Sequence, residues 1–358
     1  MKDSGADKKR ATVRDVAKSA GVDPSIVSRV LNGDAGRVSP VTRERIFGAA
    51  AALGYRPNAL ARSLSLGKTL TIGVLAPSLT NPGYAEMLAG IEQGAAAHGY
   101  VLLHASTHDD DAAMIMQIER MENRVDGILM ASARRGSAAL AELDRARVPF
   151  ILVNRAGGKE QYSVVGDDSE AARIATAHLI SLGHERIGYV TGPDDIDTLV
   201  RRMAGYRDAM DMARLAIDPG WVVTATLDEA GGAEATRRML ALPDKTRPTA
   251  IFYSTISIAL GGAEAARELR FRVPADLSLV SFDDSPLLRH LAVPMTAMRM
   301  PDNAMGLKAV ELLHERIEGR DVPKHTRIAK RPELIIRSST RAPEGAKVTL
   351  PATSAKGR

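Results

Sequence analysis

The chain has 358 residues, of which 45% are hydrophobic, 25% are charged and 4% are aromatic, and it contains no cysteine. This length fits two or three domains with a large core, and the lack of cysteine excludes disulfides, thiolate metal sites and a cysteine nucleophile. The formal net charge of +5 is unevenly distributed: residues 1–68 hold 13 Lys and Arg against 6 Asp and Glu, and the remaining residues hold 35 against 37. The basic charge is therefore concentrated in the N-terminal segment.

No stretch approaches the ~18 to 20 consecutive apolar residues that a membrane span needs. The first ten residues, MKDSGADKKR, are polar and lack the apolar segment of a secretory signal. We expect a cytoplasmic protein without membrane contact.

Residues 12–20 predict a short helix. Thr12 is a good N-cap, and Asp15, three residues later, can complete a capping box. Gly21 can adopt the positive φ that ends a helix. The apolar face of this helix comprises Val13, Val16 and Ala17.

A second helix is predicted to begin directly after this turn. Asp23 is its expected cap, and Pro24 occupies its first turn, where a missing N–H costs nothing. The side chains expected to face inward are Ile26, Val27 and Val30, and those expected to face outward are Ser25, Ser28, Arg29 and Asn32.

Two short helices joined by a glycine turn are typical of a helix-turn-helix, whose second helix enters the DNA major groove. Arg29 is the best candidate for base recognition, because an arginine can donate two hydrogen bonds to guanine. The basic charge of residues 1–68 fits phosphate contact. Double-stranded DNA is therefore the expected partner.

A third helix is predicted from Ser39 as cap and Pro40 as first residue to Leu53 and Gly54 at its end. Its expected buried side comprises Val41, Ile46 and Ala49. Residues 57–65 could add about two helical turns, but isolated helices shorter than ~12 to 15 residues are marginal in water. We expect that segment to need partners.

From Leu70 onward, β-rich runs alternate with helical ones, which predicts parallel sheets. Two such series indicate two lobes, with the binding cleft at the carboxyl ends of the strands. The first series has strands in 71–77, 100–106, 126–132 and 148–154, and helices at 82–98, 110–122 and 138–145. We expect it to end with the strand in 148–154. The second has strands in 185–192, 221–226, 248–254 and 276–282, and helices at 169–182, 200–213, 230–241 and 257–270.

The motifs of residues 11–340 resemble those of the lactose-repressor/galactose-repressor (LacI/GalR) family in order and spacing. In the N-terminal part they are TVRDVAKSAGV, VSRVLNG, VSPVTRERI and LGYRPNALARSL, and further on they include VDGILM, HLISLGHERIGYVTGP, RRMAGYRDAM and LSLVSFDDSP. The resemblance implies an α/β protein with an all-α helix-turn-helix headpiece and a two-lobed effector domain like that of periplasmic sugar-binding proteins, in which the chain crosses between the lobes three times.

The corresponding domain boundaries follow from this resemblance and from the composition. We expect disordered tails at 1–10 and 341–358, a DNA-binding domain at 11–55 and a hinge helix or linker at 56–68. The effector and dimerisation domain spans 69–340. Its N-lobe takes about 69–166 and 298–325, and its C-lobe takes about 167–297 and 326–340.

The resemblance also implies a function. The expected protein is a transcriptional regulator that acts as a repressor and binds a pseudo-palindromic operator as a homodimer. A tetramer is the alternative assembly. Leu64 matches a leucine that the family inserts into the minor groove. The full set of candidate DNA contacts is Thr12, Val13, Pro24, Ser25, Ser28, Arg29, Asn32, Arg37, Ser39, Thr42, Tyr55, Asn58 and Leu64.

The cleft is expected to bind a small-molecule effector: a sugar, a sugar derivative or another metabolite. Arg202 and Asp283 match family positions that contact effector hydroxyls or carboxylates, for which a guanidinium and a carboxylate are suited. A surface ion pair and a helix-cap carboxylate are the structural alternatives. The other candidates are Asn81, Tyr84, Asn154, Arg155, Thr198, Leu227 and Thr255.

Three departures from the family pattern stand out. Residues 253–256 read Tyr-Ser-Thr-Ile where many relatives read Ala-Ala-Asn-Asp, and Gly83 stands where relatives usually carry an aromatic. These differences put a standard sugar effector in doubt and leave open a regulator without ligand control. The loop over residues 32–37 is one residue longer than the commonest form.

The sequence contains no complete motif of the enzyme and cofactor classes considered. Gly67-Lys68-Thr69 resembles the end of a P-loop, but Arg62 occupies the position of the required first glycine. His104 and His108 precede three aspartates, which are better placed to cap a helix than to bind metal. We expect no enzyme activity, no cofactor and no metal. The remaining alternatives are a periplasmic binding protein and a helix-turn-helix fused to an enzyme.

Overall fold

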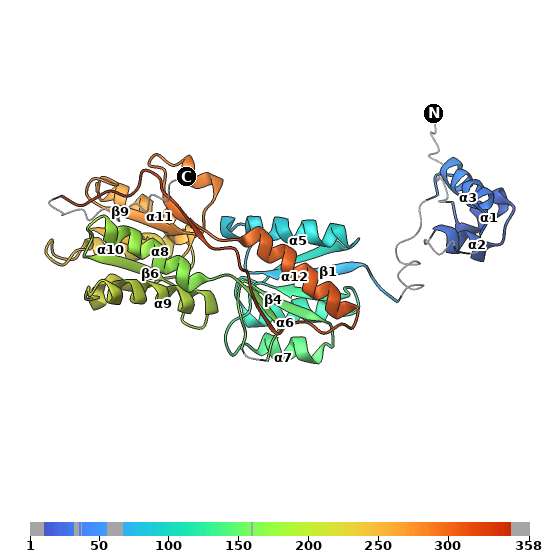
Figure 1. Ribbon diagram of the computed structural model, residues 1–358, viewed down its shortest axis with the longest axis horizontal. Helices are drawn as coiled ribbons and strands as arrows, with labels where there is room; N and C mark the ends of the chain where they lie inside the picture. Colours follow the sequence, from blue (N-terminus) through green and yellow to red (C-terminus); the bar gives the residue numbers. More distant parts are fainter. Residues whose placement is uncertain (1–10, 32–35, 37, 56–66, 159, 345–358) are drawn as a thin grey trace, which may run out of the picture. The chain divides into compact units, whose positions relative to one another are not determined.

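The computed structural model describes residues 11–31, 36, 38–55, 67–158 and 160–344. The chain divides into two compact units, residues 1–70, here the head, and residues 71–358, here the body (Figure 1). The helix predicted over 57–65, the loop at 32–35 and the tail at 1–10 lie outside the described residues. Arg341, assigned above to a disordered tail, is instead fixed to the body by donating from Nη2 to the Ala275 carbonyl at 2.8 Å.

The head consists of α1 (Val13–Ala20), α2 (Pro24–Leu31) and α3 (Pro40–Ala52). The predicted capping box is confirmed: Asp15 N–H donates to the Thr12 hydroxyl, and the Asp15 carboxylate accepts from Thr12 N–H at 2.8 Å. Gly21 ends α1 at φ 64°, as expected. The buried side chains of the small core are Val16, Ala17, Ala20, Val27, Val30, Ile46, Ala49 and Ala50.

Val41, which was predicted to lie in the core of the head, faces solvent instead. Val41 is 72% exposed, whereas Ile46 is fully buried. Five residues turn an α-helix by about 500°, so Val41 points well away from the face of Ile46. Ala50, which follows Ile46 by four residues, completes the buried face instead.

The first sheet of the body, which defines the N-lobe, has six parallel strands in the order β11-β5-β4-β3-β1-β2. The series does not close at residue 154 as predicted, because two further short strands extend it. The strands are β1 (Thr71–Ala76), β2 (Val101–Ser106), β3 (Gly127–Met130), β4 (Phe150–Val153), β5 (Ser163–Val165) and β11 (His325–Arg327).

The second sheet, which defines the C-lobe, has the order β12-β10-β9-β8-β6-β7, parallel except for β12. Its two added strands are β10 (Thr296–Arg299) and β12 (Glu333–Ile335), which follow the predicted series. The others are β6 (Ile187–Thr191), β7 (Val222–Thr224), β8 (Ala250–Tyr253) and β9 (Ser278–Phe282).

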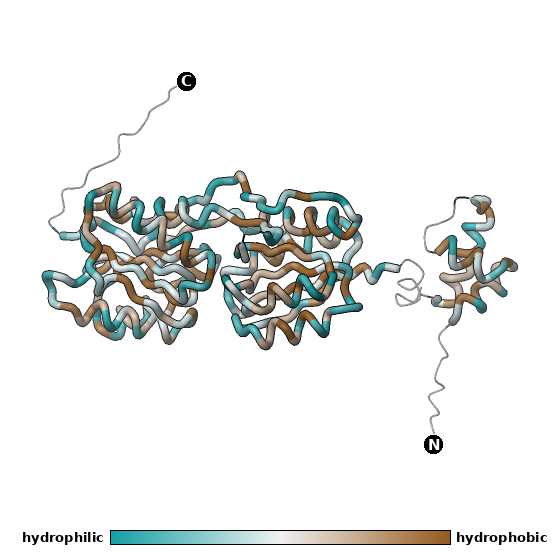
Figure 2. The backbone as a smooth tube through the Cα atoms, turned by 90° about the horizontal axis from the view of Figure 1, so that it is seen from below, coloured by the Kyte–Doolittle hydropathy of each residue, from teal (hydrophilic) through white to brown (hydrophobic). Residues whose placement is uncertain are grey.

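Helix pairs cover both faces of each sheet (Figure 1). In the C-lobe, alternate residues of β8 make this clear: Phe252 packs with α8 and α9, and Ile251 and Tyr253 pack with α10 and α11. Apolar strands accordingly fill the interior of each lobe (Figure 2). The helices pair as α5 (Ala85–Ala97) with α12 (Asp302–Ile317), α6 (Asp111–Met121) with α7 (Ala138–Arg145), α8 (Asp168–Ser181) with α9 (Asp197–Met212), and α10 (Glu229–Leu240) with α11 (Ile256–Glu268).

Three 3-10 turns complete the described part of the body. The helix predicted from residue 82 begins as one of these turns before α5 starts at Ala85. The helix predicted from residue 200 begins earlier, at Asp197. The turns are η1 (Pro82–Tyr84), η2 (Pro219–Trp221) and η3 (Pro286–Arg289).

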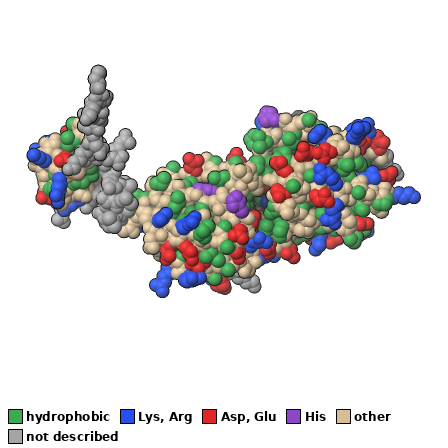
Figure 3. All heavy atoms as spheres, turned by 180° about the vertical axis from the view of Figure 1, so that it is seen from behind, with side chains coloured by type: hydrophobic (Ala, Val, Ile, Leu, Met, Phe, Trp, Pro, Cys, Tyr) green, Lys and Arg blue, Asp and Glu red, His purple; other side chains and the backbone are tan. Residues whose placement is uncertain are grey.

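The chain passes between the two sheets three times, after β5, after β10 and after β11. α12 therefore belongs to the N-lobe although it follows strands of the C-lobe. Acidic and basic side chains are interspersed on the face of the body shown in Figure 3, which fits its nearly balanced charge. Within the described parts of the chain, no helix has both the length and the apolar content to cross a membrane.

Candidate DNA surface and ligand cleft

The second helix of the head presents a polar, solvent-accessible surface. Pro24, Ser25 and Arg29 are exposed, and Ser28 is partly buried. Asp23 fixes the start of α2 by accepting from Ser25 N–H at 2.8 Å and from its hydroxyl at 2.6 Å. The Arg29 guanidinium is therefore carried on a capped helix, which is the arrangement that base recognition needs.

The other candidates for DNA contact lie at helix ends or against the core of the head. Thr12 caps α1 and Ser39 caps α3, with the Thr42 hydroxyl 2.9 Å from that of Ser39. Val13 and Tyr55 are partly buried against the core. Exposed helix N-termini bind phosphate oxygens well. The candidates Asn32, Arg37, Asn58 and Leu64 lie outside the described residues.

The body has a cavity of about 810 Å³ between its two lobes. Its walls come from residues that follow the carboxyl ends of the parallel strands of both sheets, as ligand sites in such folds do. All nine effector candidates predicted from the sequence line it: Asn81, Tyr84, Asn154, Arg155, Thr198, Arg202, Leu227, Thr255 and Asp283.

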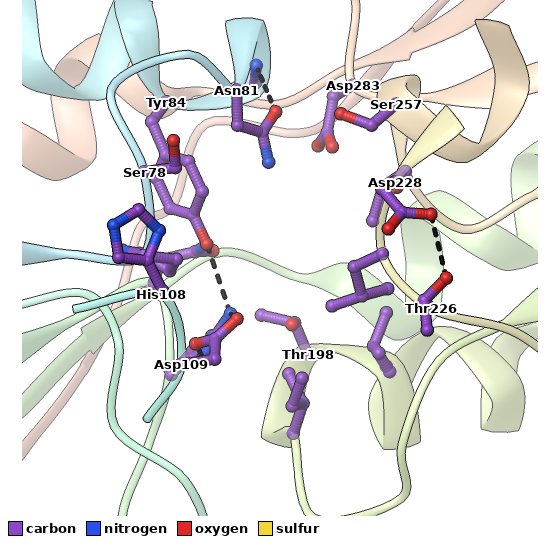
Figure 4. A pocket seen from close by; sticks show the side chains of 18 of the residues that line it. Ser78, Asn81, Tyr84, His108, Asp109, Thr198, Thr226, Asp228, Ser257 and Asp283 are labelled. Atoms are coloured by element: carbon purple, nitrogen blue, oxygen red, sulfur yellow. Dashed lines mark hydrogen bonds and ion pairs between the residues drawn. The ribbon is translucent and has the colours of Figure 1, made fainter. Parts of the chain in front are cut away.

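The N-lobe wall is centred on Arg155, whose side chain is only 3% exposed. Its Nη1 donates to Asp109 Oδ1 at 2.5 Å and to the Ser132 carbonyl at 3.2 Å, and its Nη2 donates to the Tyr84 hydroxyl at 3.3 Å. Figure 4 shows Tyr84 and Asp109 on the same side of the cavity. Burial by itself would lower the pKa of Arg155, but Tyr84 and Asp109 outweigh this effect and raise it. The guanidinium is therefore charged and fixed.

The C-lobe wall is centred on Arg202, which is 4% exposed. Its Nε donates to Asp168 Oδ1 at 2.8 Å, and its Nη1 donates to the Ser254 carbonyl at 2.6 Å. Its guanidinium carbon lies 3.5 Å from the centre of the Phe282 ring, and its Nη2 lies 3.5 Å from Asp283 Oδ1. Arg202 therefore joins α9 to the ends of two strands.

Two carboxyl groups of the cavity wall, those of Asp283 and Asp302, have raised pKa values. Burial raises the pKa of Asp283 to about 6, although the charge of Arg202 opposes the shift. Burial, together with the charge of Asp283, raises the pKa of Asp302 well above its usual range. Perturbed carboxyl groups in a cleft mark candidate functional residues.

Four residues of the cavity wall adopt the left-handed backbone conformation that most residues avoid: His108 at φ 51°, Asp109 at 55°, Asn154 at 69° and Asp283 at 67°. Asn, Asp and His tolerate this conformation better than most other residues. Such local strain is commonly found at binding sites, where the surrounding fold holds a side chain in place.

Ion pairs connect the two lobes at the edge of the cavity. Arg134 Nε donates to Asp195 Oδ2 at 2.7 Å, and Arg135 Nη2 donates to Asp197 Oδ1 at 2.7 Å. Burial would raise the pKa of Asp197, but Arg201 and Arg135 lower it. The loop after β3 is thus held against the start of α9.

Several residues of the cavity wall were not predicted from the sequence. Asp109 is one of the three aspartates favoured above as helix caps, but it pairs with Arg155, and the cap of α6 is Asp110. Asp302 follows a strand that was not predicted. Both come shortly after a strand end, which is the signal that could have found them. Further examples are Ser78, His108, Arg134, Asp228 and Ser257.

His104 lies on β2, and burial lowers the pKa of its imidazole. In the described ranges, no group of three or more His, Cys, Asp or Glu side chains is arranged to hold a metal ion.

Two family profiles match the chain. The profile described as bacterial regulatory proteins, lacI family, matches residues 12–58, and that of a periplasmic binding protein-like domain matches residues 176–340. The ribose operon repressor of Escherichia coli K12 is 35% identical over 310 residues, which cover 86% of this chain and 93% of that protein. The HTH-type transcriptional repressor PurR of Haemophilus influenzae is 34% identical over 337 residues, covering 93% and 99%.

Solved structures give the same result. The lac repressor dimer bound to operator and the anti-inducer ONPF superposes with a TM-score of 0.82 at 26% identity, covering 93% of this chain and all of that one. The complex of the transcriptional regulator CelR with cellobiose gives a TM-score of 0.70 at 30% identity, covering 92% of this chain and all of that one.

Proposed function

Because the chain belongs to the lacI family of bacterial regulatory proteins, we propose specific roles for its head and its cleft. It is a DNA-binding transcriptional regulator controlled by a small-molecule ligand. The relatives named above are repressors, and we propose that this chain also represses. Its DNA partner implies a cytoplasmic location.

The head supplies sequence recognition. In the proposed complex, α2 lies in the major groove and Arg29 donates to a guanine, while the N-termini of α1 and α3 contact phosphates. The exposed guanidinium of Arg29 and the caps Thr12 and Ser39 support this assignment. If about 6 to 10 phosphates are contacted, affinity should fall ~10³- to 10⁵-fold between 50 and 200 mM salt.

Two copies of the chain are proposed to bind one operator. A pseudo-palindromic site matches the two-fold symmetry of a homodimer, in which each head occupies one half-site. The lac repressor neighbour is a dimer on its operator. Leu64, outside the described residues, retains its proposed role as a wedge in the minor groove.

The cleft is proposed as the effector site. The observation that carries this proposal is that nine residues chosen from the sequence, from both lobes and far apart in the chain, line one cavity. A cavity of about 810 Å³ falls in the range of ~300 to 1,000 Å³ typical of small-molecule sites. Arg202 and Asp283 are proposed to bind the polar groups of the ligand.

The position of the cavity between the two lobes gives the ligand a way to control DNA binding. A ligand shifts the arrangement of the lobes only by binding one arrangement more tightly than another. A coupling of ~1 to 3 kcal/mol would change DNA affinity about 5- to 150-fold. The ion pairs of Arg134 and Arg135 with the C-lobe are among the contacts that such a movement would change.

The test is selection of genomic fragments by the full chain, with and without metabolite pools. We expect a small set of fragments sharing a pseudo-palindrome, and a metabolite that raises the melting temperature and changes affinity for these fragments. Retention of random fragments would contradict the proposed recognition. Selective DNA binding that no metabolite changes would instead support the alternative of a regulator without ligand control.

A further inference from the structure

Two pairs of consecutive residues divide their contacts between the cavity and the segments that join the lobes. Arg202 and Asp283 line the cavity. Their neighbours, Arg201 on α9 and Asp284 after β9, instead contact residues at the three places where the chain crosses between the lobes. Consecutive residues of a helix point about 100° apart, so Arg201 and Arg202 face different surroundings. Because the members of each pair are joined by one peptide bond, a displacement of one also displaces the other.

Arg201 connects α9 of the C-lobe to two strand ends of the N-lobe. Its Nη1 donates to the carbonyl of Gly166, directly after β5, at 2.8 Å, and its Nη2 donates to that of Asn154, directly after β4, at 2.9 Å. Gly166 belongs to the first crossing, since α8 of the C-lobe begins two residues later, at Asp168. One guanidinium group therefore fixes the first crossing to the helix that carries Arg202.

Asp168 strengthens this connection because both arginines share its carboxylate. Its side chain is fully buried, its Oδ1 accepts from Arg202 Nε at 2.8 Å, and its Oδ2 pairs with Arg201 Nη1. Charge-assisted hydrogen bonds of this kind are stronger than neutral ones and fix geometry as well. The cavity arginine is thus held to the first crossing through the carboxylate that begins α8.

Asp284 makes the corresponding connection at the second and third crossings. Its side chain is 6% exposed and accepts from Arg299 Nη2 and Arg337 Nη2 at 2.6 Å each. Arg299 is the last residue of β10, where the chain leaves for the N-lobe, and it pairs in register with Glu333, the first residue of β12, where the chain returns. Arg299 Nη1 lies 3.6 Å from Glu333 Oε2. Asp284 is therefore fixed where both crossings meet the C-lobe.

Asp283 turns from the end of β9 into the cavity. Its backbone is left-handed at φ 67°, and its carboxylate points into the open space shown in Figure 4. A non-glycine residue keeps such a conformation when the surrounding structure fixes it. The two buried ion pairs of Asp284 supply fixed contacts at the adjacent residue.

We propose that Arg201 and Asp284 are positioning residues that tie the ligand-binding residues Arg202 and Asp283 to the crossings and thereby set the angle between the lobes. The proposal rests on the proposed function of the cleft as the effector site. A ligand that displaces Arg202 moves the first crossing through Arg201. A ligand that displaces Asp283 moves the other two through Asp284.

Three matched variants of the full chain test this proposal, each of which replaces an arginine outside the cavity wall with methionine. Arg201→Met removes both hydrogen bonds to the N-lobe, and Arg299→Met removes the partner of Asp284 that lies at the crossings. The control Arg272→Met removes an arginine that donates to Asp276 at 2.6 and 2.8 Å within one loop of the C-lobe.

The angle between the lobes is measured as the distance between two spin labels, at Ala141→Cys on α7 and Glu234→Cys on α10. Both positions are exposed, and the chain has no other cysteine. Labelled chains are mixed with an excess of unlabelled ones, so that only distances within one chain are measured. We expect the distance distribution to shift or broaden in Arg201→Met and Arg299→Met and to stay as in the wild type in the control. Unchanged distributions in both variants would overturn the proposal.

Affinity for a selected genomic fragment separates positioning from a merely structural role. We expect it to change about 5-fold or more in Arg201→Met and Arg299→Met and less than about twofold in the control. A lower melting temperature with unchanged distances and unchanged affinity would show that the pairs only stabilise the fold, and would also overturn the proposal. If Arg201→Met does not fold, Arg299→Met carries the test, because that side chain is 48% exposed.

Failure of the proposed function would be recognised separately. If the wild type prefers no genomic fragment, DNA regulation is wrong, but the label distances still decide whether Arg201 and Asp284 set the angle between the lobes. If the wild type selects a fragment and the distances do not respond to the variants, only the positioning role is wrong.

Discussion

The head and the cleft differ in how their residues come together. Thr12, Asp23 and Arg29 act within three short helices that are nearly continuous in the sequence, and their caps are hydrogen bonds between neighbours two or three residues apart. In the cleft, Arg155 pairs with Asp109 across 46 residues, and Arg202 contacts Ser254 across 52. The head is thus specified by local chemistry, and the cleft is specified by topology.

This difference predicts where mutations should be most severe. In the cleft, charged groups are buried and depend on partners from distant elements, so removal of one leaves others unpaired in a medium of low dielectric. In the head, the functional side chains are exposed and should affect DNA binding more than folding. The predictions below test this contrast, from the largest expected effect to the smallest.

Arg202→Ala should be the most destabilising of these changes. It leaves Asp168 with one arginine partner and removes the partner of Asp283, which for buried pairs costs about 3 to 5 kcal/mol. The single tryptophan, Trp221, lies in the C-lobe and reports its unfolding in urea by fluorescence. The control Arg237→Ala removes an exposed pair with Glu268 and should cost at most about 1 kcal/mol. Similar losses for both variants would contradict the contrast.

Asp283→Asn should change how stability depends on pH. The pKa of Asp283 is raised to about 6 in the folded chain, so its contribution is present at pH 4 and is lost as pH rises towards 6. Relative to the asparagine variant, the wild type should lose about 2 to 3 kcal/mol over that interval. The free energy of unfolding at pH 4, 5, 6 and 7 measures this. A constant difference between the two proteins across this range would refute the shift.

Arg29→Ala should weaken binding to the selected operator by about 1 to 3 kcal/mol, because two hydrogen bonds to a guanine are lost. Its melting temperature should stay close to that of the wild type, since the side chain is exposed. Fluorescence anisotropy with labelled operator measures the loss. Arg267→Ala, an exposed arginine on α11, serves as the matched control and should leave operator affinity unchanged. If Arg29→Ala instead weakened operator and random duplex equally, Arg29 would be a phosphate contact.

Thr12→Ala should cost about 1 kcal/mol of local stability, because it removes the side-chain half of the capping box of α1. Faster hydrogen exchange of the α1 amides would reveal the effect. Ser19→Ala, at an exposed position inside the same helix, provides the comparison and should leave exchange slow. Equal exchange in both variants would mean that the cap does not hold the helix.

The sequence predicted the structural features that depend on residues close to one another in the chain. The caps Thr12 and Ser39, the turn at Gly21 and the long strands of both sheets all follow from local patterns. It missed β5 and β11, which fall outside the two predicted series of alternating strands and helices. Val41 was placed inside because it is apolar, although its helical phase relative to Ile46 directs it to solvent.

The cleft could be predicted only in part. The family pattern located nine of its residues, among them Arg202 and Asp283. It did not reveal that Asp109 pairs with Arg155, because this pair forms only when strand ends from separate parts of the chain meet.

The most direct test of the account is equilibrium binding of the full chain to a selected genomic fragment and to a shuffled duplex of equal composition, at 50 to 200 mM salt. The account predicts at least ~10³-fold tighter binding to the selected fragment and a steep loss of affinity for both duplexes as salt increases. Equal affinity for the two duplexes at every salt concentration would contradict it.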